Sequence, residues 1–371
     1  MKDDPTILVT CGEASGDLHA AHLVGELRRR IPHANIVAFG GDNVRAAGAR
    51  LLYHIDDYSA IVGMSGVLTN LPRLARLERN LKRALADADL FIPVDYPGLN
   101  LRLAARAKQL AVPVLYYISP QVWAWGRGRV EKMTRLVDFM AVILPFEEKI
   151  YRDEGIPVEF VGHPFVEDHA LPAPRGQQGR EGIGLLPGSR AQEVRRILPV
   201  LLETAHMIHR ERPRETFTIG LSPSVPKSIY RKILSRYALD VMFEDNAQDV
   251  MARAKLLLVA SGTATLQGAL FETPLIIVYR MSLVNYLFAR TVVKIDHIGL
   301  VNIILGEEIC PEFIQIEARP KTIAGKALTL LEDPSQRTAM LARFGDLRAM
   351  LSGGGGCRRV AEISQRLLSS V

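Results

Sequence analysis

A single aspartate placed after an apolar stretch is the first candidate for chemistry in this 371-residue sequence. Asp95 follows residues 90–94, which are apolar or proline, and this pattern predicts a buried strand that ends at the acid. A carboxylate in such a place is poorly hydrated, so its pKa is raised and it suits a general base. Pro97 and Gly98 follow closely, and an Asp that caps a turn is the alternative interpretation.

Two small-residue turns in the second half of the chain are the next candidates. "LLPGSRAQEV" (185–194) and "LLVASGTATLQ" (257–267) each pass from an apolar strand through Gly and Ser into a predicted helix. The N–H groups at a helix N-terminus have no acceptor within the helix and bind anions. Ser189 adds a hydroxyl, and Arg190 adds a guanidinium that binds phosphate bidentately unless it is simply solvated. Two such turns predict a ligand with more than one phosphate.

A third turn, "TCGEASGDL" (10–18), follows the first predicted strand. It differs from a dinucleotide-binding loop because Glu13 interrupts the glycine pattern and no acid closes the next strand. Asp17 is placed to cap the following helix, so a purely structural turn is an equally good interpretation.

Residues 62–90 combine an apolar stretch with a basic helix pattern. Leucines recur at helical spacing from Leu71 to Leu85, and Arg73 and Arg76 stand among them. Such a stripe normally faces a core, whereas apolar residues in the preceding loop suit an anionic membrane surface. The predicted membrane or acyl-chain contacts are Val62, Met64, Val67, Leu68, Leu71, Arg73 and Arg76.

Both tryptophans, Trp123 and Trp125, lie close to Arg127 and Arg129. Interleaved aromatic and basic residues can stack nucleobases, but packing or contact with an amphiphilic substrate explains one isolated cluster equally well. The three cysteines are too scattered for disulfides or zinc, and no residue spacing suggests a metal site or a bound cofactor.

The elements that would position these residues alternate between short apolar strands and helix-length segments, which predicts doubly wound α/β domains. We expect one domain over residues 1–170, a second over 180–345 and a tail helix over 346–371, because residues 171–182 are rich in proline and glycine. Hydrophobic residues make up 48% of the chain and the net charge is +6, too low to indicate nucleic acid alone. Neither a signal peptide nor a membrane span is predicted, so any membrane contact would be peripheral.

Eight blocks of the sequence resemble, in order and spacing, those of the lipid-A-disaccharide synthases. They are "GEASGD", "PVDYPGLN", "YYISPQVWAW", "LPFEEKIY", "FVGHP", "LLPGSRAQEV", "ASGTATLQ" and "VNIILGEE". The resemblance implies a GT-B fold, in which two Rossmann-like domains face each other across a cleft. It also implies an inverting glycosyltransferase that joins UDP-2,3-diacylglucosamine to 2,3-diacylglucosamine 1-phosphate (lipid X). The products would be the β-1,6-linked lipid A disaccharide phosphate and UDP.

Site residues follow from the same resemblance. Asp95 matches the aspartate thought to deprotonate the acceptor 6-hydroxyl. The implied donor-side residues are Gly188, Ser189, Arg190, Glu193, Ser261, Gly262, Thr263, Ala264, Gln267 and Asn302. The implied cleft-loop residues are Glu13, Ser15, Gly16 and Asp17. Gln267 departs from the family pattern, which generally has a ribose-binding Glu at this position.

The resemblance further implies lipopolysaccharide synthesis for the Gram-negative outer membrane, at the cytoplasmic face of the inner membrane. It allows a homodimer. The tail helix would pack on the N-terminal domain or be exchanged between subunits. Two other functions remain open from the residues. One is a different UDP-sugar enzyme of the GT-B class, either an N-acetylglucosaminyltransferase or an epimerase. The other is a non-catalytic, membrane-docked nucleotide-binding module.

Overall fold

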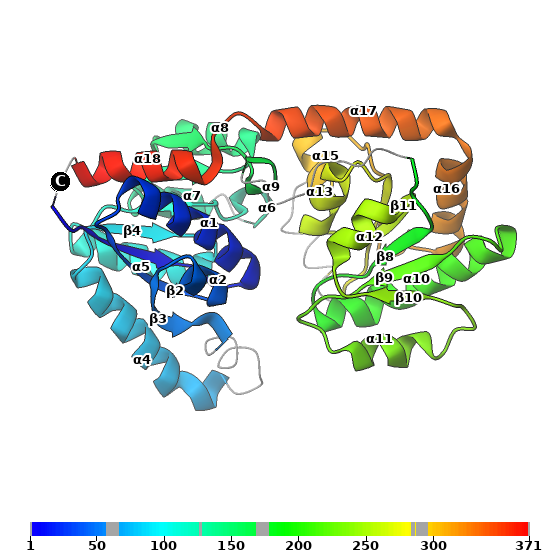
Figure 1. Ribbon diagram of the computed structural model, residues 1–371, viewed down its shortest axis with the longest axis horizontal. Coiled ribbons are helices and arrows are strands. Elements are labelled where there is room, and N and C mark those ends of the chain that lie inside the picture. The colour runs from blue at the N-terminus through cyan, green and yellow to red at the C-terminus, as the bar shows by residue number, and fades with distance from the viewer. Residues whose placement is uncertain are drawn as a thin grey trace. The chain divides into compact units, whose positions relative to one another are not determined.

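The chain folds into two compact units (Figure 1). The computed structural model describes residues 2–56, 67–125, 128–167, 178–282, 286 and 296–369, without the side chains of residues 14, 67–74, 124, 125, 128 and 129. Unit 1 comprises Met1–Ala170 together with Leu351–Val371, and unit 2 comprises Leu171–Met350. None of the described helices is long and apolar enough to cross a membrane.

Unit 1 is built on parallel strands. Its first sheet has the order β3-β2-β1-β4, formed by β1 (Thr6–Thr10), β2 (Asn35–Gly40), β3 (Arg50–His54) and β4 (Leu90–Pro93). Its second sheet has the order β5-β6-β7, formed by β5 (Leu115–Tyr117), β6 (Phe139–Val142) and β7 (Val158–Phe160). Parallel bridges from Phe91 to Val114 and from Val94 to Tyr117 connect β4 with β5, so the strands run 3-2-1-4-5-6-7 across the unit.

Helices connect the strands of unit 1. They are α1 (Ala14–Arg30), α2 (Asp42–Ala46), α4 (Val67–Ala86), α5 (Pro97–Gln109), α6 (Val122–Trp125), α7 (Gly128–Thr134), α8 (Pro145–Asp153) and α9 (Pro164–Glu167). Leu77, Leu81 and Leu85 of α4 are buried, which confirms that this part of the leucine stripe faces the core. The start of α4 corrects the prediction of a loop at Val67 and Leu68, because the helical pattern of the leucines continues upstream of Pro72.

Unit 2 contains one parallel six-stranded sheet of order β10-β9-β8-β11-β12-β13. Its strands are β8 (Ile183–Leu186), β9 (Phe217–Gly220), β10 (Met242–Glu244), β11 (Leu256–Ala260), β12 (Leu275–Tyr279) and β13 (Glu312–Ile314). Its helices are α10 (Ala191–Glu211), α11 (Lys227–Leu234), α12 (Ala247–Arg253), α13 (Thr263–Leu270), α15 (Leu300–Leu305), α16 (Pro320–Glu332) and α17 (Pro334–Leu351). The central strands β8 and β11 are fully buried, as expected for a sheet with helices on both faces.

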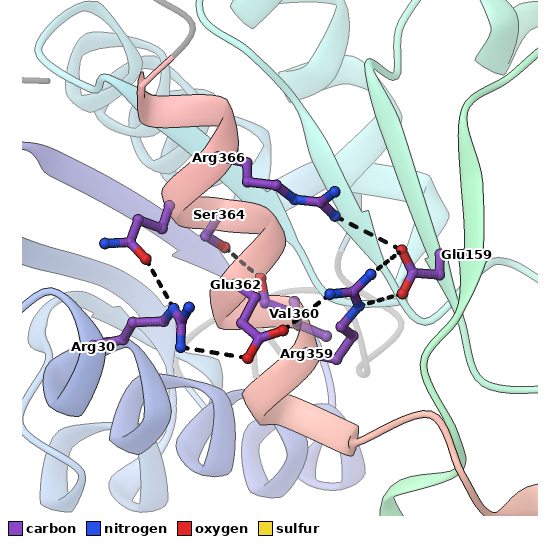
Figure 2. A network of polar contacts seen from close by, with 8 residues as sticks. Arg30, Glu159, Arg359, Val360, Glu362, Ser364 and Arg366 are labelled. Atoms are coloured by element: carbon purple, nitrogen blue, oxygen red, sulfur yellow. Dashed lines mark hydrogen bonds and ion pairs between the residues drawn. The ribbon is translucent and has the colours of Figure 1, made fainter.

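The chain returns to unit 1 after α17 and ends in α18 (Gly356–Ser369), which packs along α1 (Figure 1). Its apolar face is buried, and its polar face carries a charge network (Figure 2). Arg359 binds the Glu159 carboxylate of β7 through two nitrogens and also pairs with Glu362 at 3.0 Å. Glu362 in turn pairs with Arg30 of α1 at 3.4 Å. These contacts fix the last helix to unit 1 at both α1 and β7.

Candidate active site

The strand order of unit 1 reverses between β1 and β4, which lie side by side with Thr10 opposite Pro93. Loops that leave neighbouring strands in opposite directions open a crevice at the carboxyl edge of a parallel sheet, and ligands of α/β proteins bind there. Residues 11–13 leave β1 at this point, and residues 94–96 leave β4. The structure therefore brings the predicted cleft loop and Asp95 to the same edge.

Asp95 is held there by its backbone. Its N–H donates to the Tyr117 carbonyl at 3.0 Å. Its carbonyl accepts from the Tyr116 hydroxyl at 2.8 Å and from Asn100 Nδ2 at 2.7 Å. Both Asp95 and Tyr96 have φ of 48°, a left-handed conformation that costs free energy for residues other than glycine. The neighbouring strand and helix thus impose the conformation that presents the carboxylate.

Gly12 is the residue that allows the two loops to meet. A Cβ at this position would lie 2.1 Å from the Tyr96 ring, so only glycine lets the ring pack against the loop after β1. Because Tyr96 directly follows Asp95, the same contact also restrains the candidate base. Gly12, the first residue of "GEASGD", is therefore needed for the close approach of the two loops.

The Asp95 carboxyl has an unusual affinity for protons. Asp95 is exposed to solvent, but the surrounding protein removes enough hydration from its carboxyl to raise the pKa from 3.8 to about 6. This loss of hydration is the largest cause; a hydrogen bond from the Tyr96 backbone lowers the pKa, and the Glu13 carboxylate raises it. A base with a pKa near 6 is ionised at neutral pH and still accepts protons well.

The other predicted cleft-loop residues divide into two groups. Glu13 and Ser15 are exposed, whereas Gly16 and Asp17 are buried. The structure corrects the prediction that Asp17 lines the cleft or caps the following helix. Asp17 is only 2% exposed, and its carboxylate accepts N–H groups of residues 41, 43 and 44 around the start of α2. It therefore holds α2, a helix other than the one predicted, and does not face a ligand.

The strand order of unit 2 also reverses, between β8 and β11, and both predicted anion turns follow these two neighbouring strands. At the start of α10 the Arg190 side chain is 72% exposed and free to reach a ligand. The structure corrects the prediction that Glu193 binds the donor directly. Its carboxylate accepts the N–H groups of Ser189 at 3.1 Å and Arg190 at 3.3 Å. It maintains the turn, while an anion would use the Arg190 side chain and the remaining first-turn N–H groups.

The start of α13 provides the second turn. Gly262 (φ 142°) and Thr263 are exposed, and Ala264 is half-buried. The Ser261 hydroxyl donates to the Ile298 carbonyl at 2.8 Å, which attaches the turn to the segment before α15. Gln267 lies one turn into α13 and is half-buried, and within the described part of the chain its amide makes no hydrogen bond. The Gln267 amide is therefore available to a ligand.

Asn302 is a further correction. It is fully buried, and its amide is saturated: Nδ2 donates to the Cys310 carbonyl and to Glu312, while Oδ1 accepts the N–H groups of residues 309 and 310. Glu312 also accepts the N–H groups of Ile298 at 2.8 Å and Gly299 at 2.9 Å. Asn302 and Glu312 thus support the segment that holds Ser261, and the side-chain amide of Asn302 is fully used by these contacts.

Of the predicted membrane residues, Arg76 is exposed on α4. Val62 and Met64 lie outside the described residues, as do the side chains of Val67, Leu68, Leu71 and Arg73.

Trp123 donates its indole N–H to Glu147 at 3.2 Å, which favours packing over base stacking for this residue. Sequence reasoning missed Tyr116, Asn100, Glu147 and Glu312, because nothing in their local sequence shows what they contact.

Two units built on parallel sheets, each with loops gathered at a switch point of its strand order, define a GT-B-type fold. Solved structures support this class at the level of the fold. A putative UDP-N-acetylglucosamine 2-epimerase from Listeria monocytogenes matches with a TM-score of 0.66 and 12% identity, covering 99% of this chain and 98% of that one. The calicheamicin glycosyltransferase CalG4 matches with a TM-score of 0.60 and 15% identity, covering 99% of each chain. The predicted fold class, α/β with two Rossmann-like domains, is confirmed.

The sequence relationship is closer. The family model described as lipid-A-disaccharide synthetase matches residues 7–352. A lipid-A-disaccharide synthase of Nitrosococcus oceani is 40% identical over 375 residues, covering 98% of this chain and 96% of the relative. A relative of the same name from Myxococcus xanthus is 38% identical, and the alignment covers 99% of this chain and 99% of the relative. The chain belongs to the lipid-A-disaccharide synthase family, and it is a glycosyltransferase of lipid A biosynthesis.

Proposed function

We propose that this protein transfers the diacylglucosamine unit of UDP-2,3-diacylglucosamine to the 6-hydroxyl of 2,3-diacylglucosamine 1-phosphate. The anomeric configuration inverts, and UDP is released. The observation that carries the proposal is Asp95 at the switch point of unit 1, where its raised pKa suits proton abstraction from an alcohol. Family membership supports the choice of this reaction among those of GT-B enzymes.

In the proposed mechanism the Asp95 carboxylate removes the proton of the acceptor 6-hydroxyl. The resulting oxygen attacks the anomeric carbon of the donor, and the bond from that carbon to the UDP oxygen breaks with its electron pair. Loss of hydration is the main cause of the raised pKa of Asp95, and the Glu13 carboxylate adds to it. The fixed backbone of Asp95 keeps the carboxylate oriented, which lowers the entropy lost on reaching the transition state.

Negative charge grows on UDP as the bond breaks, and unit 2 is suited to stabilise it. The Arg190 guanidinium and the helix N-termini of α10 and α13 lie at adjacent strand ends. Oriented N–H groups and a guanidinium stabilise a leaving diphosphate without having to reorganise during the reaction. We propose that both turns together bind the pyrophosphate of UDP.

Gln267→Glu is expected to tighten the binding of UDP about fivefold. We propose that Gln267 accepts a hydrogen bond from a ribose hydroxyl, and a carboxylate accepts such a bond about 1 kcal/mol more strongly than an amide. Isothermal titration calorimetry with UDP measures the change. Gln248→Glu, on α12 of the same unit, is the matched control for the added charge. Equal affinity in Gln267→Glu and wild type would exclude a ribose contact at this position.

We further propose that the basic face of α4 binds the anionic surface from which acylated substrates are taken, at the cytoplasmic side of the inner membrane. Arg76 and Arg79 are exposed on the same side of the helix. Replacing both with glutamate should reduce binding to vesicles that contain phosphatidylglycerol by at least tenfold, since each basic residue near such a surface contributes about 1 kcal/mol. Reversal of Arg231 and Lys232 on α11 is the control, and unchanged vesicle binding in the α4 variant would refute the proposal.

Mass spectrometry of the product formed from UDP-2,3-diacylglucosamine and lipid X tests the proposed function directly. A disaccharide monophosphate carrying four acyl chains is the expected product. Conversion of UDP-N-acetylglucosamine instead would favour the epimerase or N-acetylglucosaminyltransferase alternative. UDP binding without turnover would favour the non-catalytic nucleotide-binding module. A homodimer stays a prediction, which light scattering of the purified protein tests.

A further inference from the structure

Glu147 is a carboxylic acid buried in unit 1 that the proposed reaction does not use. It lies in the first turn of α8 and is only 2% exposed. Its Oε1 accepts from the Ser119 hydroxyl at 3.0 Å and from the Trp123 indole at 3.2 Å, and its Oε2 accepts the Leu144 N–H at 3.3 Å. A buried carboxyl with three donors orients all three of them.

Ser119 is the centre of this arrangement. Its hydroxyl also lies 2.8 Å from the Tyr151 hydroxyl, which comes from the next turn of α8. Glu147 and Tyr151 thus hold Ser119 from the same helix. Ser119 stands two residues after the end of β5, so α8 determines where this strand turns toward Trp123.

The end of β5 is also what holds Asp95. Tyr117 accepts the Asp95 N–H at 3.0 Å, and the Tyr116 hydroxyl donates to the Asp95 carbonyl at 2.8 Å. Between these residues and Ser119 lies Ile118, whose φ of 61° is rare for a β-branched residue. Such a conformation persists only where both flanks are fixed: β5 fixes one side, and the contacts of Ser119 fix the other.

The surroundings of Glu147 raise the pKa of its carboxyl. Burial is the largest cause that raises its pKa, to about 8; hydrogen bonds from Ser119, Trp123 and Leu144 lower it, and the Asp95 carboxylate raises it. Tyr151 is a further titratable neighbour, and burial raises the pKa of its hydroxyl above the usual value. Burial thus favours the neutral form of Glu147, whereas its three hydrogen-bond donors favour the carboxylate.

We propose that Glu147 is a positioning residue for the transfer reaction: it fixes Ser119 and the Trp123 indole, and through them the end of β5 that orients Asp95. The inference rests on the proposed role of Asp95 as the base. Glu147 itself does not touch the reacting atoms, and it acts through one connected set of hydrogen bonds. Its loss would therefore lower turnover more than substrate binding.

Glu147→Ala is expected to lower kcat by about 10–100-fold, because a displacement of about 1 Å at the base costs rate on this scale. KM for the UDP-sugar should change less than about twofold, since the donor turns lie in unit 2. Glu147→Gln keeps an acceptor for Ser119 and Trp123 and should retain most of the activity. Glu148→Ala is the control, because this neighbour pairs with Arg152 at the surface and should behave as wild type.

The pH profile separates positioning from a loss of folded protein. Looser packing in Glu147→Ala admits water to Asp95, and the added hydration lowers the pKa of the Asp95 carboxyl. The acidic limb of the kcat profile should therefore move below pH 6 in Glu147→Ala and stay in place in Glu147→Gln.

Trp123→Phe keeps the aromatic contact with Phe146 and loses only the indole donor. If Glu147→Ala does not fold, Trp123→Phe should still show a smaller loss of kcat; wild-type kcat in that variant would overturn the proposal.

A double-mutant cycle with Asp95→Asn tests the route through Asp95. If Glu147 acts through Asp95, Glu147→Ala should lower the residual rate of Asp95→Asn less than about threefold. Losses that multiply fully would overturn the inference and leave Asp95 as the base. A fully active Asp95→Asn would refute the base assignment instead, and any loss in Glu147→Ala would then have another cause.

Discussion

Asp95→Asn abolishes most product formation and leaves UDP binding intact: we expect kcat to fall about 10²–10⁴-fold, the usual contribution of a general base. Asparagine is the informative substitution because it tolerates the left-handed φ of 48° at this position better than alanine does. The backbone contacts with Tyr116, Tyr117 and Asn100 therefore survive, and only the proton acceptor is lost. Steady-state rates with both acylated substrates, together with the Kd of UDP, measure the two effects.

The pH dependence of the wild-type enzyme gives the same test without a mutation. A base acts only when it is deprotonated, so kcat/KM should fall about tenfold per pH unit below the Asp95 pKa of about 6. The raised pKa also affects stability: ionising Asp95 in the folded protein costs free energy, so its contribution to stability is lost as the pH rises from 3.8 through about 6. Asp95→Asn cannot ionise and should be at least as stable as wild type above pH 6.

Asp138→Asn is a suitable control for the removal of an acid in unit 1. Asp138 pairs with Lys108 at 2.6 Å and accepts the Val114 N–H at 2.8 Å, away from the switch point. It should lower stability and leave the pH profile unchanged. Wild-type turnover in Asp95→Asn, or a flat profile between pH 5 and 7, would show that another group takes the proton.

Local pattern was enough to predict most strands of this fold. The apolar runs 6–10 and 35–40 predict two strands, and β1 and β2 have these bounds, because buried parallel strands are continuous apolar stretches. No such run predicts β3 or β13. β3 lies at the sheet edge with only half-buried residues after Arg50, and β13 is only three residues long, so neither has a continuous apolar pattern.

The site was only partly predictable, because contacts between distant segments decide what a polar residue does. The types and spacing of Asp95, Arg190 and Ser261 were enough to place them at strand ends. Asp17 and Asn302 carry the same polar groups, yet their partners are the N–H groups around α2 and the segment 309–312, which no local pattern indicates. Glu147 could be found only as an acid in the first turn of a helix, and its burial depends on the packing of α8.

Arg190→Ala is expected to weaken the binding of UDP about 10–100-fold and to lower kcat as well. A hydrogen bond to a charged group contributes about 1.5–3 kcal/mol, and the guanidinium forms two with a phosphate. The side chain is 72% exposed and makes only a loose ion pair with Glu193 at 3.9 Å, so its loss leaves the turn intact. Glu193 still accepts the N–H groups of Ser189 and Arg190 in the variant. The effect is therefore on the ligand and not on the fold.

Arg195→Ala and Arg190→Lys make this prediction specific. Arg195 is an exposed residue one turn further along α10, so its removal controls for the general loss of positive charge and should change the Kd of UDP less than about twofold. Lysine at position 190 keeps the charge but loses the planar pair of donors, so Arg190→Lys should bind UDP with intermediate affinity. Calorimetry at two salt concentrations separates these contributions, because the part due to charge alone is screened. If Arg190→Ala and Arg195→Ala weaken binding equally, the arginine acts only through the general field of unit 2, and the pyrophosphate is bound by the helix N-termini alone.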